Sequence, residues 1–157
     1  MSFKMQQFLY SFLLVFATAV ITKYLVNIGL IPFYDLLNKP VATPPHKYFR
    51  YVWNGIYVLL FIGFYVALGA KKSREQSYDL NALFIMALFM QVLWTYCFFY
   101  LQQLGASVVV ILLLDIISAL LMHTLLLVST TAFFLIMPYF IWLLFATYLN
   151  VFIVFLN

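Results

Sequence analysis

The chain has 157 residues, of which 8% are charged and 68% are hydrophobic, and its mean hydropathy is +1.10. So small a charged fraction excludes a soluble domain with a polar surface and makes the lipid bilayer the solvent of the protein. The net charge of +4 comes from basic residues next to apolar segments, which indicates membrane-surface contact rather than nucleic-acid binding. The single cysteine, Cys97, excludes an internal disulfide and is expected to be a packing residue.

Apolar segments of membrane-spanning length follow one another along the whole chain. Backbone groups in lipid must be satisfied internally, and continuous apolar runs favour helices over the alternating strands of a barrel. The sequence therefore predicts an all-α integral membrane protein, a five-transmembrane-helix bundle in one domain of residues 1–157. The expected helices cover residues 5–29, 44–70, 80–101, 106–128 and 132–156, which places the two termini on opposite sides.

The connections between these helices differ in length. Two short connections predict that the last three helices are sequential antiparallel neighbours. The connection of residues 30–43 is long enough to suggest a functional loop, and Thr43 followed by Pro44 suits the N-cap and first position of the second helix. Basic residues are expected in equal number on the two sides, so they do not select an orientation. The short N-terminus, without a presequence rich in Arg and Ser, favours a bacterial cell membrane.

Large aromatic residues recur at helical spacing or in the middle of spans, together with one small residue on the same helix face as two of them. They are Trp53, Tyr57, Trp94, Tyr139, Trp142 and Ala146. One interpretation is core packing alone. The other is a flat, aromatic cavity that holds a large planar apolar ligand, with Gln91, Asn150 and the indole N–H groups as polar contacts.

Asp115 and His123 are the only ionisable residues deep in a predicted span. A charged Asp at a helix centre costs about 2.5–3.5 kcal/mol, so Asp115 is expected to face the bundle interior. The two residues lie about 12 Å apart along one helix, so a proton relay between them would need water or Ser118. The alternative is a hydrogen-bonded structural Asp. His46 could ligate the metal of a tetrapyrrole or simply be solvated, and no metal site or required cofactor is predicted.

Three segments resemble the TspO/MBR family, which includes the tryptophan-rich sensory proteins and the mitochondrial translocator protein. They are residues 34–57 (YDLLNKPVATPPHKYFRYVWNGIY), residues 91–99 (QVLWTYCFF) and residues 138–150 (PYFIWLLFATYLN). The third segment is similar to the family element Pro-Tyr-x-x-Trp … Ala-x-x-Leu-Asn. The order of the segments, their spacing and the number of helices also agree with the family.

The resemblance implies a five-helix bundle that often dimerises and binds porphyrins, such as protoporphyrin IX or haem, beneath the long first loop. Trp53 and Trp142 match the two tryptophans implicated in light-dependent porphyrin breakdown, and they are the catalytic candidates if that reaction occurs. The expected ligand-binding residues are Pro44, Pro45, Trp53, Tyr57, Gln91, Trp94, Tyr139, Trp142, Ala146 and Asn150.

The chain departs from the family pattern at three positions. Ala42 replaces a loop tryptophan and removes one stacking surface, Tyr51 replaces a proline, and Gln91 replaces an asparagine while keeping the amide. No basic residue follows Arg74, so the sterol motif of the last helix is not expected to operate.

The leading hypothesis is a membrane-embedded, tetrapyrrole-binding sensor or carrier with residues 30–43 as its lid. Its expected partners are membrane lipid, a porphyrin-type ligand and a second copy of the chain, without nucleic acid. One alternative is a light-dependent catalyst of porphyrin breakdown. The other is a small-molecule transporter or assembly partner that uses Asp115 and His123.

Overall fold

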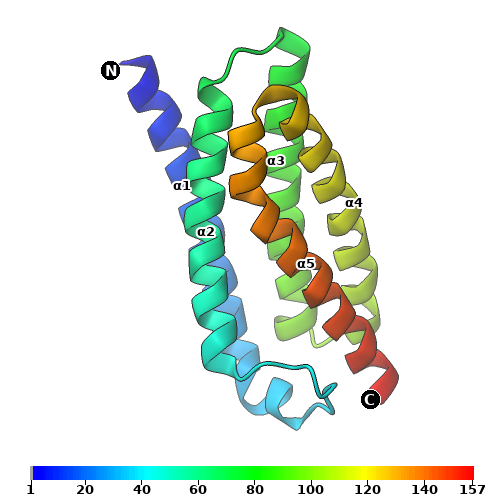
Figure 1. Cartoon of the computed structure of the whole chain (residues 1–157). Coiled ribbons are helices and arrows are strands. Elements are labelled where there is room, and N and C mark those ends of the chain that lie inside the picture. The colour runs from blue at the N-terminus through cyan, green and yellow to red at the C-terminus, as the bar shows by residue number, and fades with distance from the viewer. Residues whose placement is uncertain (1) are drawn as a thin grey trace.

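In the computed structural model, residues 2–157 are described, and they form five long helices (Figure 1). The helices are α1 (Phe3–Gly29), α2 (His46–Gly69), α3 (Arg74–Thr95), α4 (Leu104–Val128) and α5 (Thr130–Leu156). Two π-helical turns, η1 (Leu30–Tyr34) and η2 (Tyr96–Tyr100), extend α1 and α3. All five helices are long and apolar enough to cross a membrane, which confirms the predicted all-α, five-span fold. The two termini lie at opposite ends of the bundle (Figure 1).

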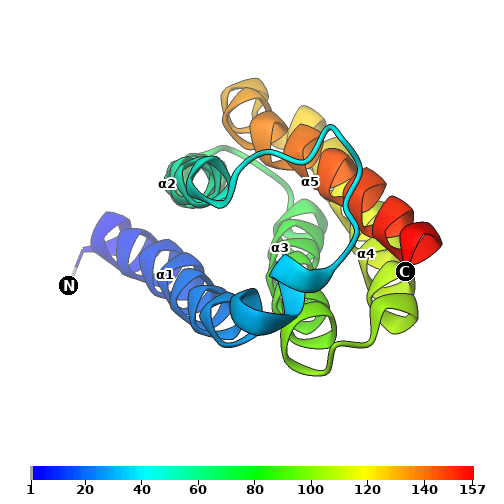
Figure 2. The same ribbon diagram turned by 90° about the horizontal axis from the view of Figure 1, so that it is seen from below.

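The helices form a closed ring in the order α1, α2, α5, α4, α3, and α3 returns to contact α1. The view along the bundle shows this order, with the segment between α1 and α2 crossing one end (Figure 2). The prediction that α3, α4 and α5 are sequential neighbours is confirmed. In this arrangement the five helices surround a common interior instead of packing in two layers.

Large apolar side chains occupy both the interior and the outer surface of the ring. Phe64 of α2 and Phe84 of α3 are fully buried, and their rings stack with centroids 3.7 Å apart. On the outside, residues such as Phe16, Leu127 and Phe134 are exposed. An outer surface of this kind is stable only against lipid, as expected for an integral, multi-pass membrane protein.

Serine N-caps set the start of three helices. The Ser73 side chain accepts a hydrogen bond from the backbone N–H of Gln76, whose side chain in turn accepts from the Ser73 N–H. This capping box starts α3 at Arg74, so the expected start at residue 80 was wrong because the charged stretch is helical. At the start of α5, the Ser129 side chain accepts a hydrogen bond from the backbone N–H of Ala132, and Ser129 is the single residue between α4 and α5.

The predicted start of α2 at Thr43 and Pro44 was also wrong. The helix begins at His46, and its N-cap is Pro45 with an extended backbone (φ −56°, ψ 146°). A proline disfavours helical geometry in the residue before it, so Pro45 excludes Pro44 from the helix. Residues 35–45 therefore form the connection that we call the lid, while the first residues of the expected loop continue α1 as η1.

The junction of α1 and η1 depends on a close backbone approach. Gly29 is buried, and a Cβ atom at this position would lie 2.3 Å from the backbone oxygen of Phe99 in η2. Only a residue without a side chain permits this contact between the two π-helical turns. Cys97 lies in the same turn η2 and is a buried free cysteine, as predicted for a packing residue.

We expect Gly29→Ala to lower the free energy of unfolding by about 1–3 kcal/mol, since the new methyl group meets rigid backbone. Thermal unfolding in detergent measures the effect. Gly55→Ala is the matched control, because nothing lies within 4 Å of a Cβ atom there, and alanine favours the helix. Equal stability of the two variants would contradict the close approach.

Candidate functional site: an aromatic cavity beneath the lid

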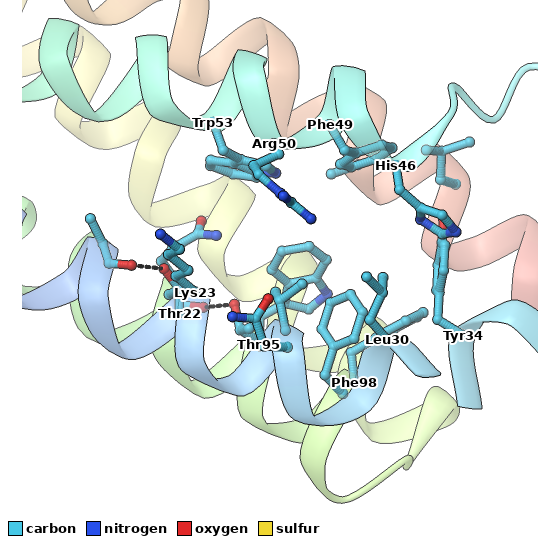
Figure 3. A pocket seen from close by; sticks show the side chains of 18 of the residues that line it. Thr22, Lys23, Leu30, Tyr34, His46, Phe49, Arg50, Trp53, Thr95 and Phe98 are labelled. Carbon is cyan, nitrogen blue, oxygen red and sulfur yellow. Dashed lines mark hydrogen bonds between the residues drawn. The ribbon is translucent and has the colours of Figure 1, made fainter. Parts of the chain in front are cut away.

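A cavity of about 140 Å³ lies inside the ring at the end covered by the lid (Figure 3). Its walls come from α1, α2, α3 with η2, and α5, while α4 contributes none of the described lining residues. On each helix the lining residues recur at intervals of three and four, which is the period of one helix face. They are residues 19, 22, 23, 26 and 27 on α1, 30 and 34 on η1, 46, 49, 50, 53, 54 and 57 on α2, 91, 94, 95, 98 and 99 on α3 and η2, and 146, 149, 150 and 153 on α5.

Six of the ten expected ligand-binding residues line this cavity: Trp53, Tyr57, Gln91, Trp94, Ala146 and Asn150. Four do not: Pro44, Pro45, Tyr139 and Trp142. The two prolines belong to the lid, outside the helical stripe that faces inward. The expected set is therefore brought together only in part.

Trp142 lies behind the cavity wall. Its ring contacts Phe49 edge-on, with centroids 5.3 Å apart, and Phe49 is the residue that faces the cavity. Trp53, by contrast, lies on the wall beside Tyr57, with centroids 5.8 Å apart. The two tryptophans expected to act together on a porphyrin thus occupy different layers of the structure.

Trp94 is fixed by a buried hydrogen-bond network between three helices. Its indole Nε1 donates to Oδ1 of Asn150 over 2.8 Å, and Nδ2 of Asn150 donates to Oγ of Ser107 over 3.0 Å. Asn150 and Ser107 are almost fully buried. Because both ends of the Asn150 amide have protein partners, this side chain orients Trp94 rather than offering a free contact to a ligand.

Gln91 provides a free polar contact. Its side chain is 2% exposed and lines the cavity, yet its Oε1 atom has no hydrogen-bond partner among residues 2–157. A buried carbonyl oxygen without a donor is costly, by about 1–3 kcal/mol. A donor on a bound molecule would satisfy it. On the opposite wall, Thr22 and Tyr57 share a hydrogen bond of 2.8 Å and so have no such need.

Two cations lie at the rim of the cavity. Lys23 of α1 and Arg50 of α2 are exposed lining residues (Figure 3). No acidic side chain is among the described lining residues, and neither cation is in an ion pair within the described chain. Both belong to the basic residues next to apolar segments, which were expected to contact the membrane surface. The spacing of three residues between Arg50 and Trp53 could have assigned Arg50 to the cavity.

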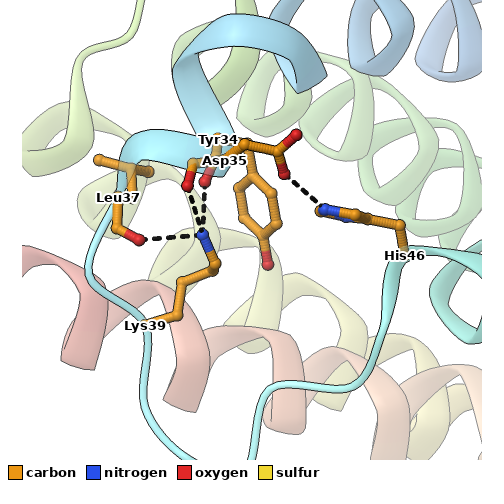
Figure 4. Close-up of polar contacts among 5 residues, drawn as sticks. All are labelled: Tyr34, Asp35, Leu37, Lys39 and His46. Carbon is orange, nitrogen blue, oxygen red and sulfur yellow. Dashed lines mark hydrogen bonds and ion pairs between the residues drawn. The ribbon is translucent and has the colours of Figure 1, made fainter.

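Tyr34 and His46, the residues on either side of the lid, close the cavity at this end. The rings of these residues contact each other with centroids 5.2 Å apart, and both residues line the cavity. Nε2 of His46 lies 2.6 Å from Oδ1 of Asp35, which joins the two ends of the lid (Figure 4). Burial and the neighbouring charge of Asp35 raise the pKa of the Tyr34 phenol to about 12, so this group stays neutral.

Two further contacts hold the lid in shape. Nζ of Lys39 donates to the backbone oxygens of Tyr34 over 2.7 Å and of Leu37 over 2.9 Å (Figure 4). Asn38 exchanges hydrogen bonds with Asn157, with its N–H donating to Oδ1 and its carbonyl accepting from Nδ2, each over 2.9 Å. The lid is therefore tied to both α1 and the end of α5.

The two ionisable residues of α4 are placed apart. Asp115 is half-buried and forms a hydrogen bond with Thr147 of α5, while His123 is exposed on the outer surface. Neither lines the cavity. The structure therefore offers no direct relay between them.

Taken together, these features define an integral, multi-pass membrane protein with an internal aromatic cavity closed by a lid. The chain belongs to the TspO/MBR family, whose family model matches residues 11–156. Membership supports a membrane sensor or transporter of the TspO type. No curated protein sequence matches the chain.

Proposed function

We propose that the cavity binds a planar, largely apolar molecule that carries carboxylate groups, and that a tetrapyrrole such as protoporphyrin IX is the ligand class. The observation that carries this proposal is the pairing of aromatic walls with an uncompensated cationic rim. Trp53 and Trp94 supply flat surfaces for a conjugated ring system. Arg50 and Lys23 supply donors for carboxylates at the edge of the ring.

Gln91 adds a contact that a free-base porphyrin can meet. Its unpartnered Oε1 accepts a hydrogen bond, and the centre of a free-base macrocycle carries N–H donors. The apolar remainder of the cavity contributes burial of the ring. This division into an apolar body and a few polar contacts is typical of small-molecule sites.

The size of the cavity implies that the lid moves. A volume of about 140 Å³ is below the roughly 300–1,000 Å³ of common ligand pockets. Entry of a macrocycle therefore requires displacement of the residues that close the cavity, and Tyr34 and His46 are the ones that belong to the lid junctions. We propose a carrier or sensor whose lid opens and closes on its ligand.

We propose binding rather than light-dependent breakdown, because Trp142 does not share the cavity wall with Trp53. Illumination of the porphyrin complex provides the check. The porphyrin absorption band is expected to fade no faster than that of free porphyrin in detergent, and faster fading would restore the catalytic alternative.

The proposal is tested by titration of the purified protein with protoporphyrin IX and, separately, with its dimethyl ester, which lacks the carboxylates. We expect saturable binding of one porphyrin per cavity, monitored by the quenching of tryptophan fluorescence. The dimethyl ester is expected to bind clearly more weakly. Absence of saturable binding would overturn the proposal. Equal affinity for acid and ester would remove the role of the cationic rim.

The lid contact between Asp35 and His46 makes a separate prediction. Both side chains are partly exposed, and exposed ion pairs contribute about 0.2–1 kcal/mol. We expect Asp35→Asn to accelerate both association and dissociation of protoporphyrin IX by up to about fivefold, because the closed lid is less stable. Stopped-flow fluorescence measures the rates.

Asp79→Asn is the matched control for this prediction. It removes an acidic residue from the opposite end of the bundle, where Asp79 has no ion pair within residues 2–157. Rates that change equally in both variants would show an effect of net charge and not of the lid.

A further inference from the structure

Asp115 forms a second polar site in the middle of the membrane-spanning region, apart from the cavity. It lies halfway along α4, and its Oδ2 is 2.8 Å from Oγ1 of Thr147 on α5. Its Oδ1 is buried and has no hydrogen-bond partner in the described part of the chain. A carboxylate at the centre of a membrane helix costs about 2.5–3.5 kcal/mol even on the mildest scales, and Asp115 has no ion pair with a cation among residues 2–157.

The hydrogen bonds of Thr147 fit a protonated Asp115. Oγ1 of Thr147 lies 2.8 Å from Oδ2 of Asp115 and 3.1 Å from the backbone oxygen of Leu143. A hydroxyl has one hydrogen, and a carboxylate and a carbonyl both need it. When Asp115 carries a proton, it donates to Thr147, and Thr147 donates to Leu143. Both distances then correspond to full hydrogen bonds.

Two hydroxyl groups extend this site toward the cavity. Ser118 lies one turn from Asp115 on the same face of α4, and Tyr139 of the neighbouring helix α5 lies close to Ser118 without a hydrogen bond between the two hydroxyls. Both side chains are at most 2% exposed, and both oxygens lack partners among residues 2–157. Tyr139 belongs to the hydrophobic core cluster against which Tyr57 packs, and Tyr57 lines the cavity.

We propose that Asp115 is a proton-binding site inside the membrane, and that its proton exchanges with the cavity through Ser118, Tyr139 and Tyr57. This inference goes beyond ligand binding, since it holds with or without a tetrapyrrole in the cavity. Hydroxyl groups in a row can pass protons, because each can accept one hydrogen while donating another. A water molecule that bridges two of them completes the row where they are not in direct contact.

The transfer conserves atoms and charge. The proton of Asp115 passes to the Ser118 oxygen while Ser118 gives its own hydrogen to Tyr139, and Tyr139 gives its hydrogen onward to Tyr57. Tyr57 in turn releases its own hydrogen to a water molecule in the cavity, which accepts the proton. Each hydroxyl keeps one hydrogen, Asp115 becomes a carboxylate, and one proton arrives at the cavity. The reverse sequence returns the proton to Asp115, and no oxidant or reductant takes part.

The surroundings of Asp115 contain few other groups that could hold this proton. From α5 the titratable neighbour is Tyr139, with Tyr57 of α2 beyond it. The charged residues of α3 lie in its first two turns, at the far end of that helix, and η2 contributes only neutral Tyr and Cys side chains. On α4 itself His123 is about two turns away and exposed.

Infrared spectroscopy of the ligand-free protein tests the protonation. The chain has four acidic residues, and the other three, Asp35, Glu75 and Asp79, are exposed side chains outside the middle of the membrane-spanning region. We expect a C=O band of a protonated carboxyl at pH 7 that is lost in Asp115→Asn. In Thr147→Val the band is expected to remain but to shift in frequency, because the Asp115 carboxyl group loses its hydrogen-bond partner. Absence of the band from the wild type would overturn the proposal.

Exchange into D₂O tests the route. The deuterium shift of the Asp115 band is expected to be several-fold slower in Tyr139→Phe, which keeps the ring but removes the hydroxyl. Tyr148→Phe, an exposed residue on the same helix, is the matched control and is expected to exchange at the wild-type rate. Equal exchange rates in all three proteins would overturn the route while leaving the porphyrin proposal untouched.

Discussion

Replacing Arg50 or Lys23 with glutamine is expected to weaken the binding of protoporphyrin IX about tenfold in each case. Both residues lie at the rim of the cavity without an acidic partner in the described chain. A hydrogen bond to a charged group contributes about 1.5–3 kcal/mol, and the exposed position of both side chains favours the lower end. Fluorescence titration gives the two dissociation constants, and the double variant is expected to show the product of both effects.

The dimethyl ester and a distant arginine provide controls for this prediction. The ester has no carboxylates, so Arg50→Gln is expected to leave its affinity unchanged. Arg74→Gln removes the same charge at the opposite end of the bundle and is expected to leave binding of the acid unchanged. If Arg74→Gln weakens binding as much as Arg50→Gln does, the attraction is one of net charge and the rim is not the recognition element.

Asn150→Leu is expected to lower the free energy of unfolding by about 2–4 kcal/mol. The substitution leaves the Trp94 indole N–H without an acceptor and removes a partner of Ser107, all in a buried region. An orphaned buried donor costs about 1–3 kcal/mol, and a lost neutral hydrogen bond about 0.5–1.5 kcal/mol. Thermal or denaturant unfolding in detergent measures the loss.

A double-mutant cycle with Trp94→Phe shows whether this loss belongs to the network. Phenylalanine has no N–H, so Asn150→Leu is expected to be markedly less destabilising in the Trp94→Phe background. If the destabilising effects of the two substitutions are additive, the hydrogen bond of 2.8 Å between Trp94 and Asn150 does not orient Trp94.

The fold could be predicted from the sequence because hydrophobic length alone defines membrane-spanning helices. The predicted boundaries were wrong at helix ends, where a few capping or proline residues, rather than hydropathy, determine the first helical residue. Ser73 and Gln76 form a capping box inside a charged stretch, and Pro45 excludes Pro44 from α2. The π-helical turn η1 has no sequence signal of its own, since it follows from the contact of Gly29 with Phe99.

The candidate site could be predicted only where aromatic residues pointed to it. Trp53 and Trp94 line the cavity as expected, whereas Trp142 lies behind Phe49, outside the cavity wall. The spacing of four residues between Trp142 and Ala146 places them on one helix face, but it does not tell which of these two side chains lines the cavity. Arg50 and Lys23 were missed because long basic side chains near a helix end usually extend to the membrane surface. The role of Asn150 could not be read from its spacing, since it depends on partners from two other helices.

A structure of the protein with bound protoporphyrin IX is the most direct test of where this protein holds its ligand. We expect the macrocycle between Trp53 and Trp94, its carboxylates next to Arg50 and Lys23, and Tyr34 and His46 displaced from their present contact. A porphyrin bound on the outer, lipid-facing surface, with the cavity and the lid unchanged, would contradict the proposed site.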